Sequence, residues 1–127
     1  MSSWWFDMRR GGLPIVYSCS GCSNVAQLAN EVAVRLDHAG VAQMSCIAGV
    51  GGGVSSLVKV AQSGQPVIAI DGCPLHCAQA CLEQVDVSPD EHVRLYDMGL
   101  KKRYGERYEE ETVRFVESEV AGRIRQL

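Results

Sequence analysis

The chain has 127 residues, of which 46% are hydrophobic and 21% are charged, and its formal net charge is −3. These values predict one globular domain with a substantial core, and the negative balance argues against a nucleic-acid partner. No apolar run approaches the roughly 20 residues of a membrane-spanning helix, and the start MSSWWFDMRRGG lacks the apolar stretch of a signal peptide. We therefore expect a cytoplasmic protein with no membrane partner. In a reducing compartment, clustered cysteines more often bind metal or perform redox chemistry than form lasting disulfides.

Residues 1–12 show no periodicity and are interpreted as an amino-terminal arm. The arm carries three adjacent aromatic residues, Trp4, Trp5 and Phe6, which pack either on their own domain or, in a homo-oligomer, on a second subunit. Residues 13–127 are predicted to form a single α/β metal-binding domain.

The domain is expected to begin with a strand followed by a helix. Residues 13–17 are apolar and partly β-branched, which suits a buried strand. Ser23 or Asn24 can cap the following helix, and Gly40 ends it. Apolar residues recur between these ends at intervals of three and four, which is typical of an amphipathic helix: Val25, Leu28, Ala29, Val32, Ala33 and Leu36.

Two further strand-loop-helix units follow. A weaker strand is predicted within residues 41–48, and a glycine-rich loop at residues 49–53 leads to a helix over residues 54–61. The apolar run 67–70 is the third strand, and Pro74 suits the first position of the next helix. This helix is expected to carry thiols at intervals of four, on Cys73, Cys77 and Cys81.

The last third of the chain predicts an edge strand, a loop and a final helix. Residues 92–98 alternate between apolar and polar, as in a strand with one wet face. Residues 101–107 are polar and read as a loop, and apolar residues at helical spacing follow over 113–127. Three glutamates, Glu109, Glu110 and Glu111, precede them, where the helix dipole favours anions.

The alternation of strands and helices predicts a small three-layer α/β fold, with a mostly parallel sheet of about four strands and helices on both faces, in a Rossmann-like arrangement. In such sheets, ligands bind outside the carboxyl ends of the strands. Cys19, Cys46 and Cys73 fall at or just past the ends of the first three predicted strands. We therefore expect these three thiols to meet at one edge of the sheet.

A zinc ion or a cubane cluster needs four soft ligands. Cys73 and Cys77 would be one helical turn apart, about 6 Å of rise, whereas Cys81 would be about 12 Å from Cys73 and could not share one ion with it. Cys81 is therefore interpreted as a small apolar residue on the buried face of the helix. Cys22 forms a C-x-x-C pair with Cys19, and the spacing leaves open whether it is a ligand, a resolving thiol or a small-residue position.

Three blocks of sequence resemble the DGC family of small bacterial and archaeal zinc-binding proteins. The blocks are SCSG at residues 18–21 with SNV at 23–25 and QLAN at 27–30, CIAGVGGG at 46–53, and IAIDGCPLHC at 68–77. The resemblance implies zinc as the cofactor, held by four matched cysteines: Cys19, Cys46, Cys73 and Cys77. Cys22, Cys81 and the aromatic arm depart from the family pattern, so Cys22 remains an additional candidate ligand.

Other interpretations use the same residues. The thiols could hold an iron–sulfur cluster, or Cys19 and Cys22 could cycle between thiol and disulfide. A weaker alternative is a small-anion or metalloid site at the glycine loop, which includes Gly51, Gly52 and Gly53. Asp71 is either a cap or a hydrogen-bonding partner of a metal ligand. His76 is expected either at the surface or as a hydrogen-bonding partner of a metal ligand. No residues form a recognisable catalytic set.

Overall fold

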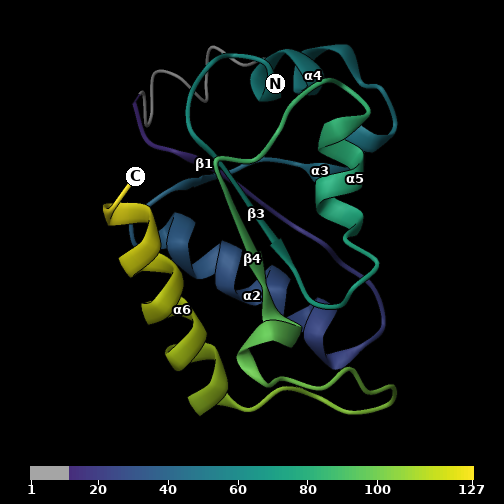
Figure 1. Cartoon of the computed structure of the whole chain (residues 1–127), viewed down its shortest axis with the longest axis vertical. Helices are drawn as coiled ribbons and strands as arrows, with labels where there is room; N and C mark the ends of the chain where they lie inside the picture. Colours follow the sequence, from purple (N-terminus) through teal and green to yellow (C-terminus); the bar gives the residue numbers. More distant parts are fainter. Residues whose placement is uncertain (1–11) are drawn as a thin grey trace.

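Four short parallel strands form the sheet at the centre of the computed structural model, which describes residues 12–127 (Figure 1). Their order is β2-β1-β3-β4. The strands are β1 (Ile15–Ser18), β2 (Gln43–Met44), β3 (Val67–Asp71) and β4 (Glu91–Arg94). Every residue of β1 and β3 is buried, because helices cover both faces of the sheet. The predicted α/β class and parallel sheet are confirmed.

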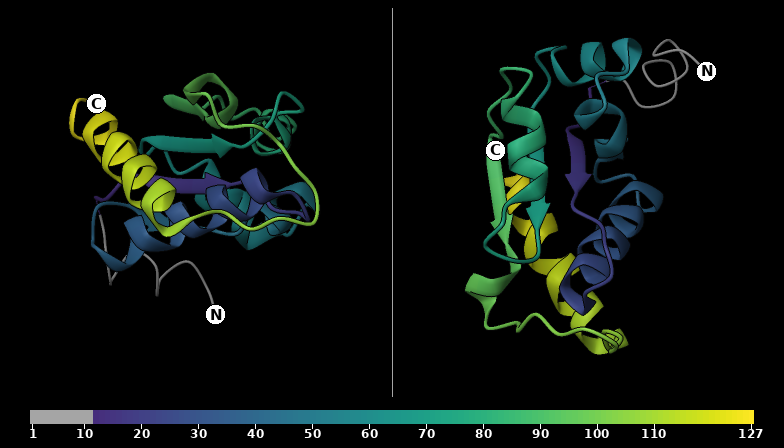
Figure 2. Two further views of the ribbon diagram at one scale, coloured as in Figure 1. Left: turned by 90° about the horizontal axis from the view of Figure 1, so that it is seen from below. Right: turned by 90° about the vertical axis from the view of Figure 1, so that its right-hand side faces the viewer.

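Helices α2 (Asn24–His38) and α6 (Glu110–Arg125) pack together on one face of the sheet. Helix α5 (Cys77–Glu83) covers the other face, where it contacts β3 and the short helix α3 (Ile47–Gly51). Helix α4 (Ser55–Ala61) packs against α3. The right-hand view of Figure 2 shows α5 in front of the strands and α6 behind them. Within residues 12–127, no helix has the length and apolar character needed to cross a membrane.

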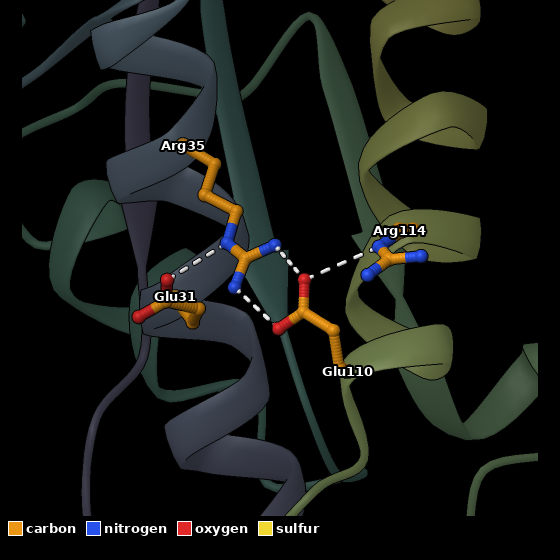
Figure 3. A network of polar contacts seen from close by, with 4 residues as sticks. All are labelled: Glu31, Arg35, Glu110 and Arg114. Atoms are coloured by element: carbon orange, nitrogen blue, oxygen red, sulfur yellow. Dashed lines mark hydrogen bonds and ion pairs between the residues drawn. The ribbon is translucent and has the colours of Figure 1, made fainter.

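Helices α2 and α6 are also joined by a network of charged side chains (Figure 3). The Arg35 guanidinium donates to both carboxylate oxygens of Glu110, at 2.7 and 2.8 Å, and to Glu31 at 2.8 Å. Arg114 donates to Glu110 from one turn further along α6, at 3.3 Å. These bonds, chiefly those from Arg35, lower the pKa of Glu110 from 4.5 to about 2. The glutamate at the start of α6 therefore stays ionised.

The helix predicted to open at Cys73 was misplaced, because α5 begins only at Cys77. A turn occupies the four residues before it, and it ends at His76, whose φ of 54° is left-handed and interrupts a regular helix. The sequence spacing predicts that Cys73 and Cys77 are neighbours on one helical face. This prediction is wrong, because Cys73 lies outside the helix.

Two predicted strands are shorter than expected. Of residues 41–48, only Gln43–Met44 pair in the sheet, and α3 starts at Ile47 with Cys46 as its cap. Strand β4 ends at Arg94 and continues as the 3-10 helix η1 (Leu95–Met98), although its predicted edge position is confirmed. The arm predicted over residues 1–12, with Trp4, Trp5 and Phe6, lies outside the described residues apart from Gly12.

Candidate functional site

A pocket of about 190 Å³ lies at the carboxyl ends of β1 and β3. It is lined by the loop between β1 and α2, by the turn between β3 and α5, and by part of the loop between η1 and α6. Four of the six cysteines line it: Cys19, Cys22, Cys73 and Cys77. We refer to it as the thiol pocket. The strand ends thus bring Cys19 and Cys73 together as predicted, but the third thiol of that prediction, Cys46, does not line the pocket, whereas Cys22 does.

Cys19 is the buried thiol of the pocket, with 8% of its surface exposed. Its Sγ accepts a hydrogen bond from the backbone N–H of Gly72, at 3.3 Å. Burial is the main cause that raises the pKa of Cys19 from 9.0 to about 11. In the metal-free protein this thiol is therefore protonated at neutral pH and is a poor nucleophile.

Gly72 lets the two cysteine-bearing segments approach each other. A Cβ at this position would lie 2.8 Å from the backbone carbon and oxygen of Val25 in the first turn of α2. Only a residue without a side chain leaves room for this contact. The glycine of the Asp71-Gly72-Cys73 sequence therefore has a packing role that helps to form the pocket.

Asp71 fixes the start of α5. Its carboxylate is 1% exposed and accepts hydrogen bonds from the backbone N–H groups of Ala78, at 2.8 Å, and Gln79, at 3.2 Å. His92 Nε2 on β4 also lies 2.8 Å from the carboxylate. These contacts position Cys77, the first residue of α5, which is exposed at the pocket.

The turn from Cys73 to His76 is held from the β4 side. His76 Nε2 lies 2.6 Å from the Tyr96 hydroxyl, and its ring meets the ring of His92 edge-on, with centroids 4.8 Å apart. His76 is thus half-buried among aromatic rings instead of lining the pocket with the thiols. Sequence analysis missed His92 and Tyr96, because no local pattern links them to this turn.

Lys102 was also missed, since it lies in a segment predicted only as a polar loop. Its Nζ donates to Cys73 Sγ at 3.6 Å. Hydrogen bonding to Tyr104 is the largest cause that raises the pKa of Lys102, so its ammonium group stays charged. Lys102 and Tyr104 both line the thiol pocket.

Cys46 and the glycine loop lie apart from the residues that line the pocket. Cys46 is exposed, and its Sγ accepts from Gly49 N–H at 3.4 Å as the cap of α3. Residues 47–51 form that short helix instead of an open loop, and Gly52 and Gly53 end it. A Cβ on Gly51 would come within 2.9 Å of Cys81 Sγ, so this glycine allows α3 to pack closely on α5. Cys81 is half-buried at that contact.

The donors of the thiol pocket suit a soft metal ion, because all four thiol groups can act as sulfur ligands. Within residues 12–127, no three or more Cys, His, Asp or Glu side chains are close enough together to hold an ion. A bound ion would therefore require the thiol side chains to rotate toward a common point. Two features favour negative charge there, the ammonium group of Lys102 and the amino end of α2, whose first turn has no acidic residue.

The sequence matches the DGC domain family over residues 15–120. It is also 64% identical, over 94 residues, to the Pseudomonas aeruginosa PAO1 protein named "Anaerobic and virulence modulator AnvM". That match covers 74% of this chain and 72% of the Pseudomonas protein. No solved structure matches the chain.

Proposed function

Because this chain belongs to the DGC domain family, we propose that it binds zinc in the thiol pocket. We further propose that it acts as a modulator, the role that the name "Anaerobic and virulence modulator" gives to its relative AnvM. One observation carries the proposal. The segments after β1 and β3 bring four thiol groups to a single pocket, although Cys19 and Cys77 are far apart in the sequence. Zinc in proteins is typically held by four sulfur or nitrogen ligands in a tetrahedron.

We assign Cys19, Cys73 and Cys77 as ligands common to every form of this proposal. The fourth is either Cys46, which the family resemblance favours, or Cys22, which is favoured by its place in the pocket. Both residues are exposed. Four thiolates would close the coordination sphere, which suits a structural zinc, whereas a labile fourth ligand would leave a position for an incoming thiol or water.

The fourth ligand can be identified by metal analysis of cysteine variants. We expect one zinc per wild-type chain after purification without added metal, and a large loss of zinc in C73S. Loss of zinc in C22A or in C46A, but not in both, identifies the fourth ligand. C81A is the matched control, because Cys81 lies on the same helix as Cys77 and outside the pocket lining. Wild-type protein without zinc, with the same metal content as C73S, refutes the proposal.

A redox role of the same thiols is the second candidate, and the word "anaerobic" in the name of AnvM favours it. The burial of Cys19 argues against simple dithiol exchange with Cys22, because a thiol with a pKa of about 11 seldom ionises. An iron–sulfur cluster avoids this difficulty, since ligation deprotonates the thiol. A coloured protein that contains iron and sulfide instead of zinc would support this candidate over the first.

A further inference from the structure

The segment that carries Lys102 is fixed to the start of α2. We call residues 101–104 the strap. The Asn24 side chain donates to Lys101 O at 3.0 Å and accepts from Arg103 N–H at 2.6 Å, and the Asn24 N–H donates to Arg103 O at 3.0 Å. Figure 2 (left) shows the loop between η1 and α6 passing the start of α2. The strap is therefore held by specific bonds beside the thiol pocket.

This attachment places one ammonium group against one sulfur atom. Lys102 Nζ lies 3.6 Å from Cys73 Sγ and 5.3 Å from the centroid of the Tyr104 ring. The backbone of Tyr104 forms an isolated antiparallel bridge with Ser23, just before α2. The ammonium group of Lys102 thus lies near both a sulfur atom and an aromatic face, each of which attracts it, although the residue is at the protein surface.

Charge indicates what such a lysine does once an ion is bound. Zn²⁺ with four thiolate ligands carries a net charge of −2, since four negative charges exceed the two positive ones. A nearby ammonium group offsets part of this charge, and its N–H···S hydrogen bond fixes the orientation of the ligand sulfur. Apart from Lys102, the residues within 12–127 that line the pocket include no lysine or arginine.

We propose that Lys102 is a positioning residue of the metal–thiolate centre, which orients Cys73 and offsets the charge of the bound centre, and that Asn24 holds it in place. This inference rests on the proposed zinc function, and it adds to that function a residue outside the cysteine motifs. It also gives the strap a role, because loss of its attachment would remove the ammonium group from the sulfur.

Lys101 provides a matched control. It is an exposed lysine next to Lys102, and its backbone carbonyl accepts the Asn24 bond. Lys101 lines a different pocket, between α2 and the loop before α6, and does not line the thiol pocket. K101M therefore removes the same charge from the same strap but leaves the contact with Cys73 intact.

The test compares zinc affinity, by competition with a chromogenic chelator, and the sulfur-to-metal absorption of the cobalt-substituted protein. We expect K102M and N24A to weaken zinc binding by about 10-fold or more and to shift the cobalt band, because partners of metal ligands typically contribute this much. K102R should restore part of the affinity, and K101M should match the wild type. Unfolding of each metal-free variant separates these effects from a loss of stability.

Two results overturn the inference, and they differ in what they say of the proposed function. If wild-type protein binds zinc, while K102M has the affinity and the cobalt spectrum of K101M, Lys102 has no positioning role and the zinc function stands. If the wild-type protein binds neither zinc nor cobalt, the proposed function and this inference both fail.

Discussion

Replacement of Gly72 by alanine tests how the thiol pocket is built. The new Cβ would lie 2.8 Å from both the backbone carbon and the backbone oxygen of Val25, and 2.9 Å from its Cβ. Ordinary contacts begin at 3.4 Å, so the two segments would have to separate by 0.6 Å, the difference between 3.4 and 2.8. The contacted backbone atoms belong to the first turn of α2 and cannot rotate away as a flexible side chain can.

Overpacking of this kind costs about 1–3 kcal/mol in a well-packed interior. Gly122, in the last turn of α6, supplies a control of opposite sign, because a Cβ there meets no atom within 4 Å. Alanine is favoured over glycine in a helix interior by about 0.5–1 kcal/mol. G72A should therefore destabilise the protein, whereas G122A should stabilise it.

The assay is urea unfolding of the metal-free proteins, followed by far-ultraviolet circular dichroism. The free energy of unfolding should fall in G72A and rise in G122A relative to wild type. G72A should also retain less zinc, since it separates Cys19 from Cys73. A G72A protein as stable as the wild type would refute the close contact between Gly72 and Val25 on which this account of the pocket depends.

Three further predictions concern single groups. In metal-free protein, Cys19 should be alkylated by iodoacetamide about 100-fold more slowly than in the unfolded chain, because burial raises its pKa from 9.0 to about 11. Peptide mass mapping measures the two alkylation rates, and equal rates would contradict the raised pKa. E110Q should lower the unfolding temperature at neutral pH, and the difference in unfolding temperature between E110Q and wild type should disappear as the pH falls from 4.5 through about 2, because Glu110 stabilises the fold only while it is ionised. A difference that stays constant over this pH range would argue against the ion pair with Arg35. D71A should lower the free energy of urea unfolding by about 1–3 kcal/mol or more, because it leaves two N–H groups of α5 without their acceptor. An unchanged urea midpoint would exclude this capping role.

Local sequence patterns were sufficient to predict the main strands and helices of the fold. The apolar runs now seen in β1 and β3 and the periodic apolar residues of α2 and α6 identify buried elements without reference to distant residues. Parallel strands then place the segments that follow β1 and β3 at one edge of the sheet. The meeting of Cys19 and Cys73 in one pocket follows from this geometry.

The start of α5 could not be predicted, because residues outside the helix decide it. Asp71 provides the acceptor for the first turn of α5, and His76 is fixed by Tyr96, which is 20 positions away. Helical spacing alone therefore put Cys73 on a helix that it does not join. Cys77 still lines the pocket, because the turn and the cap bring it there.

The contact of Lys102 with Cys73 could not be predicted from the sequence either. It depends on hydrogen bonds between Asn24 and the strap, which join residues 77 and 79 positions apart. A polar loop in a sequence does not show which of its lysines will face a cysteine. Only the folded chain distinguishes Lys102 from Lys101.

X-ray absorption at the zinc edge of the purified wild-type protein tests the central claim most directly. The account predicts one zinc per chain, with a first shell of sulfur atoms at about 2.3 Å and little or no oxygen or nitrogen. C73S should lose the metal or exchange one sulfur for a lighter atom. Protein that contains no zinc, or zinc bound mainly by oxygen and nitrogen, would contradict a thiolate centre at the carboxyl ends of β1 and β3.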